Sequence, residues 1–148
     1  MTEWSASSID WRHPAPYIHE ICVDATDMDG LQHSNNACYV TWCEQAAWQH
    51  SQQLGLGLDD YQRLDRAMAV RQAHYDYRLP THAGDVLLVG TWLHNMSGAK
   101  MERSFQLVRL ADRQTVLLAH WQLTCIEISS GKPKRLPEAF INAYGRAL

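Results

Sequence analysis

The sequence lacks a long apolar run and an excess of positive charge. No apolar segment approaches the roughly 20 residues that a membrane-spanning helix needs. The net charge of −3 at pH 7 gives no general attraction to nucleic acid or to anionic membranes. The N-terminal segment carries Glu3, Asp10 and Arg12, and it contains no apolar stretch of the signal-peptide type. We therefore expect a cytoplasmic protein that has no nucleic-acid or membrane partner.

Recognised metal, redox and nucleotide motifs are also absent. The four cysteines, Cys22, Cys38, Cys43 and Cys125, form no Cys-x-x-Cys pair, and the histidines are scattered. There is no Walker phosphate loop, no dinucleotide-binding fingerprint and no His-Glu-x-x-His motif. We therefore predict reduced thiols, no metal site and no cofactor.

What is present is the composition of an ordinary globular domain. Hydrophobic residues make up 46% of the 148 residues and charged residues 20%. This length is enough for one domain with its own core. We find no internal repeat and no low-complexity tract. We therefore predict a single domain over residues 1–148, with residues 1–16 as a loosely ordered lead-in.

Hydrophobic periodicity predicts one long helix followed by several strands. From about Asn35 to about Leu54, apolar residues recur at steps of three and four, and Gly55 then supplies a stop signal. A short helical or irregular link is expected over 58–66, and a terminal helix begun by Pro137 over 136–148. Alternating patterns predict strands over 17–23, 67–79, 86–93, 100–110 and 115–128, with turns over 95–99 and 111–114.

Short links between consecutive strands favour antiparallel neighbours. One antiparallel sheet and one long helix can bury their apolar faces against each other. The expected fold class is therefore α+β.

The stretch from Asp27 to Glu44 joins an acidic turn to the start of the long helix. Asp, Gly, Ser and Asn favour bends and helix caps, so Asn35 and Asn36 are expected to open the helix. The free N–H groups and the positive dipole end of a helix N-terminus favour negative charge. A carboxylate beside such an end, with N–H groups aimed at a developing oxyanion, suits acyl transfer.

This stretch resembles the acidic signature of the 4-hydroxybenzoyl-CoA thioesterase branch of the hotdog-fold acyl-CoA thioesterases. The signature runs Asp-x-Asp-x-x-Gly-His-x-Asn-Asn-x-x-Tyr, with a Glu further along the helix. The chain departs from it at Gln32, where the signature has Gly, and Gly30 stands two places earlier. The resemblance extends through 75–78 and 84–85 to 131–137. The matching residues are Asp27, Asp29, His33, Asn35, Asn36, Tyr39 and Glu44.

The resemblance implies a hotdog fold, in which a five-stranded antiparallel sheet wraps around one long central helix. It implies hydrolysis of an acyl-CoA to coenzyme A and a free acid, with Asp29 as the catalytic carboxylate. A general base and a nucleophile both need an ionised carboxylate near the thioester carbonyl, and the sequence leaves these two roles open. A backbone N–H near Asn36 would polarise that carbonyl.

Other residues carry weaker assignments. His33 would hold Asp29 or the attacking water, or else be structural. Glu44 is the reserve catalytic group, or else a buried acid paired with a neighbour such as an Arg. Asn35 would help to bind substrate while capping the helix, whereas Tyr39 fits core packing better than chemistry. Basic side chains that could meet coenzyme A phosphates, or simply face solvent, are Arg103, Lys132, Lys134 and Arg135. Tryptophans that could line an acyl pocket, or pack in a core or interface, are Trp42, Trp48, Trp92 and Trp121.

The resemblance also implies a homodimer or a homotetramer built as a dimer of dimers. Sites would lie at subunit interfaces, and residues of a second chain would complete each pocket. Two alternatives remain. An acyl-thioester hydratase or dehydratase on the same fold depends on a different His and acid motif, which we do not find. A non-catalytic acyl-CoA-binding hotdog domain would not need Asp29.

Overall fold

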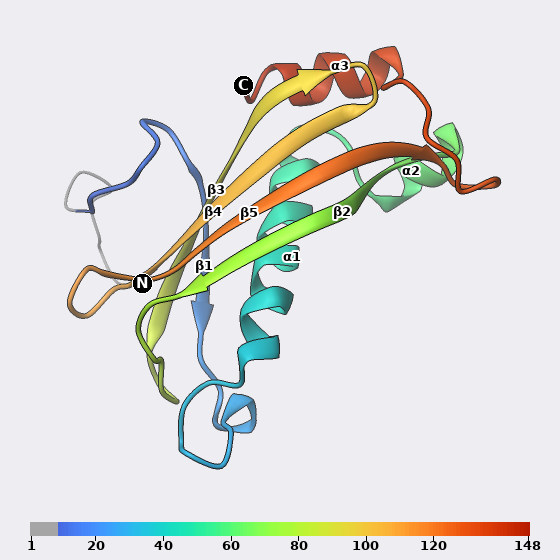
Figure 1. The fold of residues 1–148 in the computed structure, drawn as a ribbon. Helices are drawn as coiled ribbons and strands as arrows, with labels where there is room; N and C mark the ends of the chain where they lie inside the picture. Colours follow the sequence, from blue (N-terminus) through green and yellow to red (C-terminus); the bar gives the residue numbers. More distant parts are fainter. Residues whose placement is uncertain (1–8) are drawn as a thin grey trace.

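A five-stranded antiparallel sheet curves around one long helix, α1, in the computed structural model, which describes residues 9–148 (Figure 1). The strand order is β1-β3-β4-β5-β2, so β1 and β2 are the edges. This confirms the α+β class and the hotdog arrangement. The strands are β1 Tyr17–Cys22, β2 Arg66–Tyr77, β3 Val86–Ser97, β4 Lys100–Arg109 and β5 Gln114–Glu127. The helices are α1 Asn36–Gln53, α2 Leu58–Leu64 and α3 Glu138–Gly145, with a 3-10 turn, η2, at Ala25–Asp27.

Helix α1 begins and ends within one residue of its predicted bounds because both ends carry local signals. The side chain of Asn35 accepts a hydrogen bond from the Ala37 N–H at 3.0 Å and caps the first turn. Gly55 follows the last turn with φ of +97°, a conformation that favours glycine. The buried face of α1 includes Trp42, Cys43 and Ala46. No helix within residues 9–148 is both long and apolar enough to cross a membrane.

The predicted end of β3 is wrong by several residues. The expected turn over 95–99 begins later, because β3 continues to Ser97 and only Gly98 and Ala99 separate it from β4. Asn95 has φ of +57°, and the strand register shifts between His94 and Ser97. The Asn signal therefore marks a β-bulge inside a long strand and not the end of the strand.

Residues 9–16 of the expected lead-in form no helix or strand, but they pack on the outer face of the sheet. Ile9 is buried in a cluster with Leu88, Val108 and Leu110. The Trp11 ring lies directly over Gly90, where an added Cβ would come within 2.4 Å of it. This close approach requires glycine in the middle of β3. The remaining part of the lead-in, residues 1–8, lies outside the described residues.

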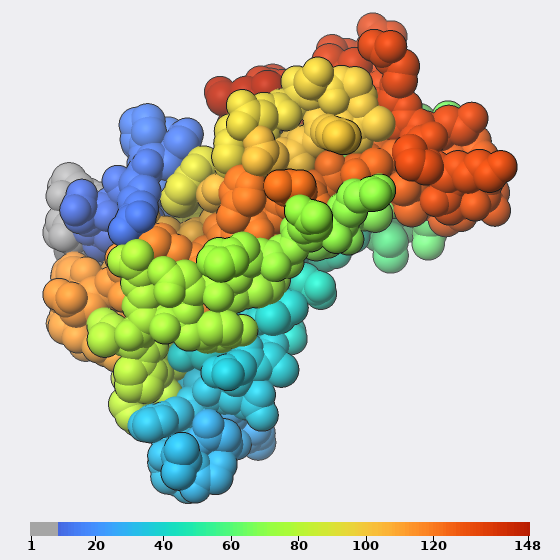
Figure 2. Space-filling model, in the orientation of Figure 1, coloured from blue at the N-terminus to red at the C-terminus, as the bar shows by residue number. Residues whose placement is uncertain are grey.

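Strand β2 is an exposed sheet edge. It pairs with β5 on one side only, and most side chains in its middle are exposed. Figure 2 shows β2 along the surface, beside α1 and close to the acidic loop at the bottom of the view. Unpaired strand edges are the usual templates for pairing with another chain, and β2 presents such an edge.

Candidate active site

The acidic loop over residues 24–35 is closed by its own carboxylates. Asp24 Oδ1 accepts from the Thr26 N–H and Asp27 Oδ2 accepts from the Asp24 N–H, each at 2.9 Å. The Asp27 carbonyl accepts from the Asn35 N–H at 2.8 Å, which ties the loop to the start of α1. Asp27 therefore stabilises the turn.

Asp29 is held by the backbone of the same loop. Its Oδ1 accepts from the Leu31 N–H at 2.8 Å and from the His33 N–H at 3.2 Å. These backbone donors, Leu31 first, lower the pKa of Asp29 below its ordinary value of 3.8. Asp29 is thus ionised at neutral pH, as a base or nucleophile must be. Its Oδ2 accepts no hydrogen bond from residues 9–148, so that oxygen remains free.

Gln32 and His33 shape the loop around Asp29. Gln32 has φ of +62°, the left-handed conformation that glycine adopts most easily. The loop therefore keeps the bend that the Gly of the signature would favour. The His33 ring packs edge-on against His82, with the ring centroids 5.2 Å apart. The His33 backbone, and not its ring, bonds Asp29.

The first turn of α1 leaves one donor unused. The Asn35 side chain caps the Ala37 N–H, and the Asn35 carbonyl accepts from the Cys38 N–H at 2.9 Å. No acceptor among residues 9–148 receives the Asn36 N–H. Asn36 is exposed at the positive end of the helix dipole, so its N–H is available to an anionic or polarised oxygen.

Tyr39 belongs to the core. It is 3% exposed, and its hydroxyl is 2.9 Å from Thr81 Oγ1, which in turn donates to Ser34 Oγ. Burial raises the pKa of Tyr39. This hydroxyl chain connects α1 to the far end of the acidic loop, so Tyr39 supports the loop and does not face substrate in a single chain.

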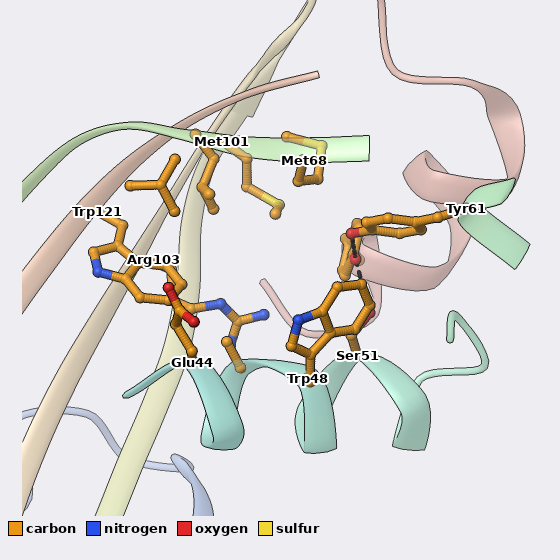
Figure 3. Close-up of a pocket in the computed structure, with 12 residues that line it drawn as sticks. Glu44, Trp48, Ser51, Tyr61, Met68, Met101, Arg103 and Trp121 are labelled. Atoms are coloured by element: carbon orange, nitrogen blue, oxygen red, sulfur yellow. Dashed lines mark hydrogen bonds between the residues drawn. The ribbon is translucent and has the colours of Figure 1, made fainter. Parts of the chain in front are cut away.

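A cavity of about 190 Å³ lies between α1 and the sheet, farther along the helix (Figure 3). Its mouth is formed by exposed side chains, Glu44 and Trp48 of α1 and Val70 of β2. Its floor is formed by buried ones, and Ser51, Tyr61 and Tyr144 line one end with linked hydroxyls. The remaining lining residues are Ala47, Met68, Met101, Arg103, Trp121 and Leu123.

Four tryptophans that could line an acyl pocket separate into two groups. Trp48 and Trp121 line the cavity. Trp42 is buried beside Tyr39, and Trp92 stacks on His13.

Glu44 faces the same cavity as Arg103, but within residues 9–148 it forms no ion pair. The interpretation of Glu44 as a buried acid paired with an Arg is therefore wrong.

Arg103 is separated from the other predicted basic residues. It is 3% exposed, whereas Lys132, Lys134 and Arg135 are all exposed on the turn after β5. In Figure 1 that turn lies at the end of β5, far from the acidic loop at the bottom of the view. A single chain therefore does not bring these three residues to Asp29. The buried Arg103 cannot meet phosphates at the surface.

The cavity is the feature that sequence reasoning missed. Its walls come from α1, α2, β2, β4, β5 and α3, and no local pattern predicts that they meet. One signal was present: Arg103 occupies the same side of its strand as Met101 and Phe105, which are apolar and buried. An arginine at an inward strand position indicates a binding partner, because charged residues are almost never fully buried unless paired.

Metal ligands and activated thiols would be the alternative chemistry in the described part of the chain. No group of three or more His, Cys, Asp or Glu side chains within it is placed to hold a metal ion. All four cysteines are free. Burial raises the pKa of Cys38, Cys43 and Cys125, so none of these three is activated as a thiolate.

Comparisons with known proteins agree on one family. A family model described as the thioesterase-like superfamily matches residues 23–144. The putative acyl-CoA thioesterase YneP of Bacillus subtilis is 23% identical over 121 residues, which cover 82% of this chain and 86% of that protein. The chloroplastic acyl-acyl carrier protein thioesterase ATL3 of Arabidopsis thaliana is 21% identical over 129 residues, covering 86% of this chain and 67% of that protein.

A solved structure agrees with the fold. Slr0204, a 1,4-dihydroxy-2-naphthoyl-CoA thioesterase from Synechocystis, matches with a TM-score of 0.81 at 22% identity. The match covers 88% of this chain and 96% of that chain. At this identity the likeness shows that the two chains share the fold.

Proposed function

Because the chain belongs to the thioesterase-like superfamily and is a thioester hydrolase, we propose that it hydrolyses an acyl-CoA to coenzyme A and a free carboxylic acid. The observation that carries this proposal is the ionised Asp29 in the loop that leads into α1, where the Asn36 N–H is unused. The names of the Bacillus and Synechocystis proteins support coenzyme A as the carrier.

In the proposed reaction, Asp29 Oδ2 accepts a proton from water as the water oxygen attacks the thioester carbonyl carbon. The carbonyl oxygen becomes an oxyanion, which accepts the Asn36 N–H. Collapse of the tetrahedral intermediate breaks the C–S bond, and the proton held by Asp29 passes to the departing sulfur. Direct attack by Asp29, with hydrolysis of the resulting anhydride, is the other route to the same products.

A second copy of the chain would complete the site. Glu44 lies eight residues beyond Asn36, or about 12 Å along the helix, so the catalytic loop and the cavity of one chain are well separated. The Tyr77 hydroxyl, at the end of β2, is 3.4 Å from the Asn36 carbonyl. The cavity mouth lies near the beginning of β2, at Met68 and Val70. Antiparallel pairing of two β2 edges would therefore bring one chain's loop to its partner's cavity.

Asp29→Asn tests the catalytic assignment. We expect kcat/KM for acyl-CoA, followed by thiol release, to fall by about 100-fold or more, which is typical for loss of a general base. Glu44→Gln is the matched comparison, because Glu44 lies at the cavity mouth and is the second candidate acid. If Asp29→Asn retains wild-type activity while Glu44→Gln is inactive, the catalytic role belongs to Glu44.

Mixing two inactive variants tests the shared site. Asp29→Asn disables the loop, and Met68→Trp obstructs the cavity mouth. If each site combines the loop of one chain with the cavity of the other, mixed dimers contain one intact site. A statistical mixture then recovers about a quarter of wild-type activity. No recovery, with mixed dimers demonstrated by mass spectrometry, would place loop and cavity of one site in the same chain.

A further experiment tests which carrier holds the acyl group. The similarity to an Arabidopsis acyl-acyl carrier protein thioesterase favours an acyl carrier protein as the alternative carrier. The two carriers are compared by offering the same acyl group on each. A higher kcat/KM on acyl-CoA supports the proposal. A higher kcat/KM on the acyl-acyl carrier protein would make the carrier protein, and not coenzyme A, the carrier of the substrate.

A further inference from the structure

Arg103 is a buried cation without an acidic partner. It lies on β4 and points inward, with only 3% of its surface exposed. Burial lowers the pKa of Arg103 to about 10, so the guanidinium is still charged at neutral pH. None of the ion pairs among residues 9–148 includes it. Burying a charge without a counter-charge is costly, so a position of this kind calls for a partner from outside the chain.

Only one edge of the guanidinium is occupied. Nη1 donates to Thr91 Oγ1 and to His50 Nδ1, both at 3.0 Å, which uses both of its hydrogens. Nε and Nη2 have no acceptor within residues 9–148. They are also not sealed in the core, because the one fully enclosed and unpaired side-chain nitrogen or oxygen there is Trp11 Nε1. The free edge must therefore reach open space, and the space beside Arg103 is the cavity.

Figure 3 shows how this edge is presented. The Arg103 side chain projects into the ring of lining residues above α1, with Glu44 on one side and Trp48 on the other. Glu44 is exposed at the mouth, where solvent screens its charge, whereas Arg103 lies at the floor. Met68, Met101 and Leu123 make the rest of the wall apolar.

We propose that the cavity binds acyl groups that end in a carboxylate, and that the free Nε and Nη2 edge of Arg103 holds this carboxylate in a two-point pair. The substrate class is then the ω-carboxyacyl thioester, with its carboxylate at the floor and its thioester at the mouth. This inference rests on the proposed thioesterase function. A carboxylate is the fitting group because its two oxygens match two parallel N–H donors of a guanidinium.

The size of the cavity limits the length of the acyl group. An apolar cavity of about 150 Å³ accommodates a benzene ring. The cavity here, at about 190 Å³, is slightly larger. It therefore suits a chain of roughly six carbons including the terminal carboxylate, on the same volume comparison.

The test compares adipoyl-CoA with hexanoyl-CoA, which have the same chain length and differ in the terminal carboxylate. We expect wild-type kcat/KM to be about 10- to 100-fold higher for adipoyl-CoA, the range for hydrogen bonds to a charged group. Arg103→Met should abolish this preference, so the readout is the ratio of kcat/KM for adipoyl-CoA to that for hexanoyl-CoA, which should fall to about 1. Arg103→Lys keeps the charge but loses the two-point geometry, so it should retain only part of the preference.

Several results would overturn the inference. Equal kcat/KM of the wild-type enzyme on hexanoyl-CoA and adipoyl-CoA refutes it, and this comparison does not depend on the folding of any variant. An equal loss on both substrates in a folded Arg103→Met variant makes Arg103 structural. A rise in melting temperature with adipate in wild type, absent in Arg103→Met and absent with the carboxylate-free hexanamide, separates carboxylate binding from hydrolysis. Adipate binding without hydrolysis of either thioester refutes the proposed function and leaves the carboxylate site standing.

Discussion

His50 should make the stability of this protein depend on pH. The ring is 6% exposed and stacks on Tyr17, with centroids 4.9 Å apart. Its Nδ1 accepts from Arg103 Nη1, and a guanidinium can only donate, so His50 must be the neutral Nε2–H tautomer. Burial, and secondly the charge of Arg103, lower the pKa of His50 to about 4 from 6.5.

Proton linkage gives the direction in which the stability of the protein changes with pH. Because the unfolded chain binds a proton at His50 more readily than the folded chain, stability is complete above about pH 6.5 and falls as the pH drops towards 4. Integrated from about pH 7.5 to about pH 5, the loss is roughly 2 kcal/mol. A domain usually has an unfolding free energy of roughly 5–15 kcal/mol. A loss of about 2 kcal/mol is therefore large enough to be measured by urea denaturation.

The assay compares wild type with His50→Gln by urea unfolding at both pH values. Gln can accept from Arg103 but does not titrate, so the variant should lose about 2 kcal/mol less than wild type on acidification. His19 and His94 also have pKa values lowered by burial, and their contributions cancel in this comparison. His74→Gln, at an exposed position on β2, is the control and should behave as wild type. An unchanged pH dependence in His50→Gln would refute the reasoning.

Three further predictions concern the loop and the sheet. Gly90→Ala should cost about 1–3 kcal/mol of unfolding free energy, because its Cβ would come within 2.4 Å of the Trp11 ring; an unchanged urea midpoint and tryptophan fluorescence would contradict this. Gln32→Gly should stabilise by up to about 1 kcal/mol, because Gln32 has φ of +62°, whereas lower stability than Gln32→Ala would count against strain there. With Asp29 as the base, kcat/KM should stay level from about pH 7 to about pH 5, since the pKa of Asp29 lies below 3.8; an acid limb inside that range would indicate another base.

The acidic loop shows how far local sequence reasoning extends. The Asp, Asn and Gly residues around Asp29 form hydrogen bonds to backbone only a few positions away, so their chemistry can be recognised without the fold. Asn35 was predicted at the helix start for the same reason. The exact partners of Asp29 could not be predicted, since they depend on the bend at Gln32.

Arg103 shows where such reasoning stops. Its sequence neighbours identify an inward strand position, whereas its charge alone suggests contact with coenzyme A phosphates or with solvent. Only the packing of α1, α2, β2, β4, β5 and α3 shows that it faces a cavity. Whether a charge is exposed or buried depends on contacts between segments far apart in the chain.

The order of helix and strands, the start of α1 and the acidic loop follow from the sequence itself, because each depends on periodicity or on bonds between near neighbours. The bulge at Asn95, the cavity and the unpaired edge of Arg103 were decided only by the tertiary structure. Those features arise where distant segments pack together, and packing is a property that no single stretch of sequence contains.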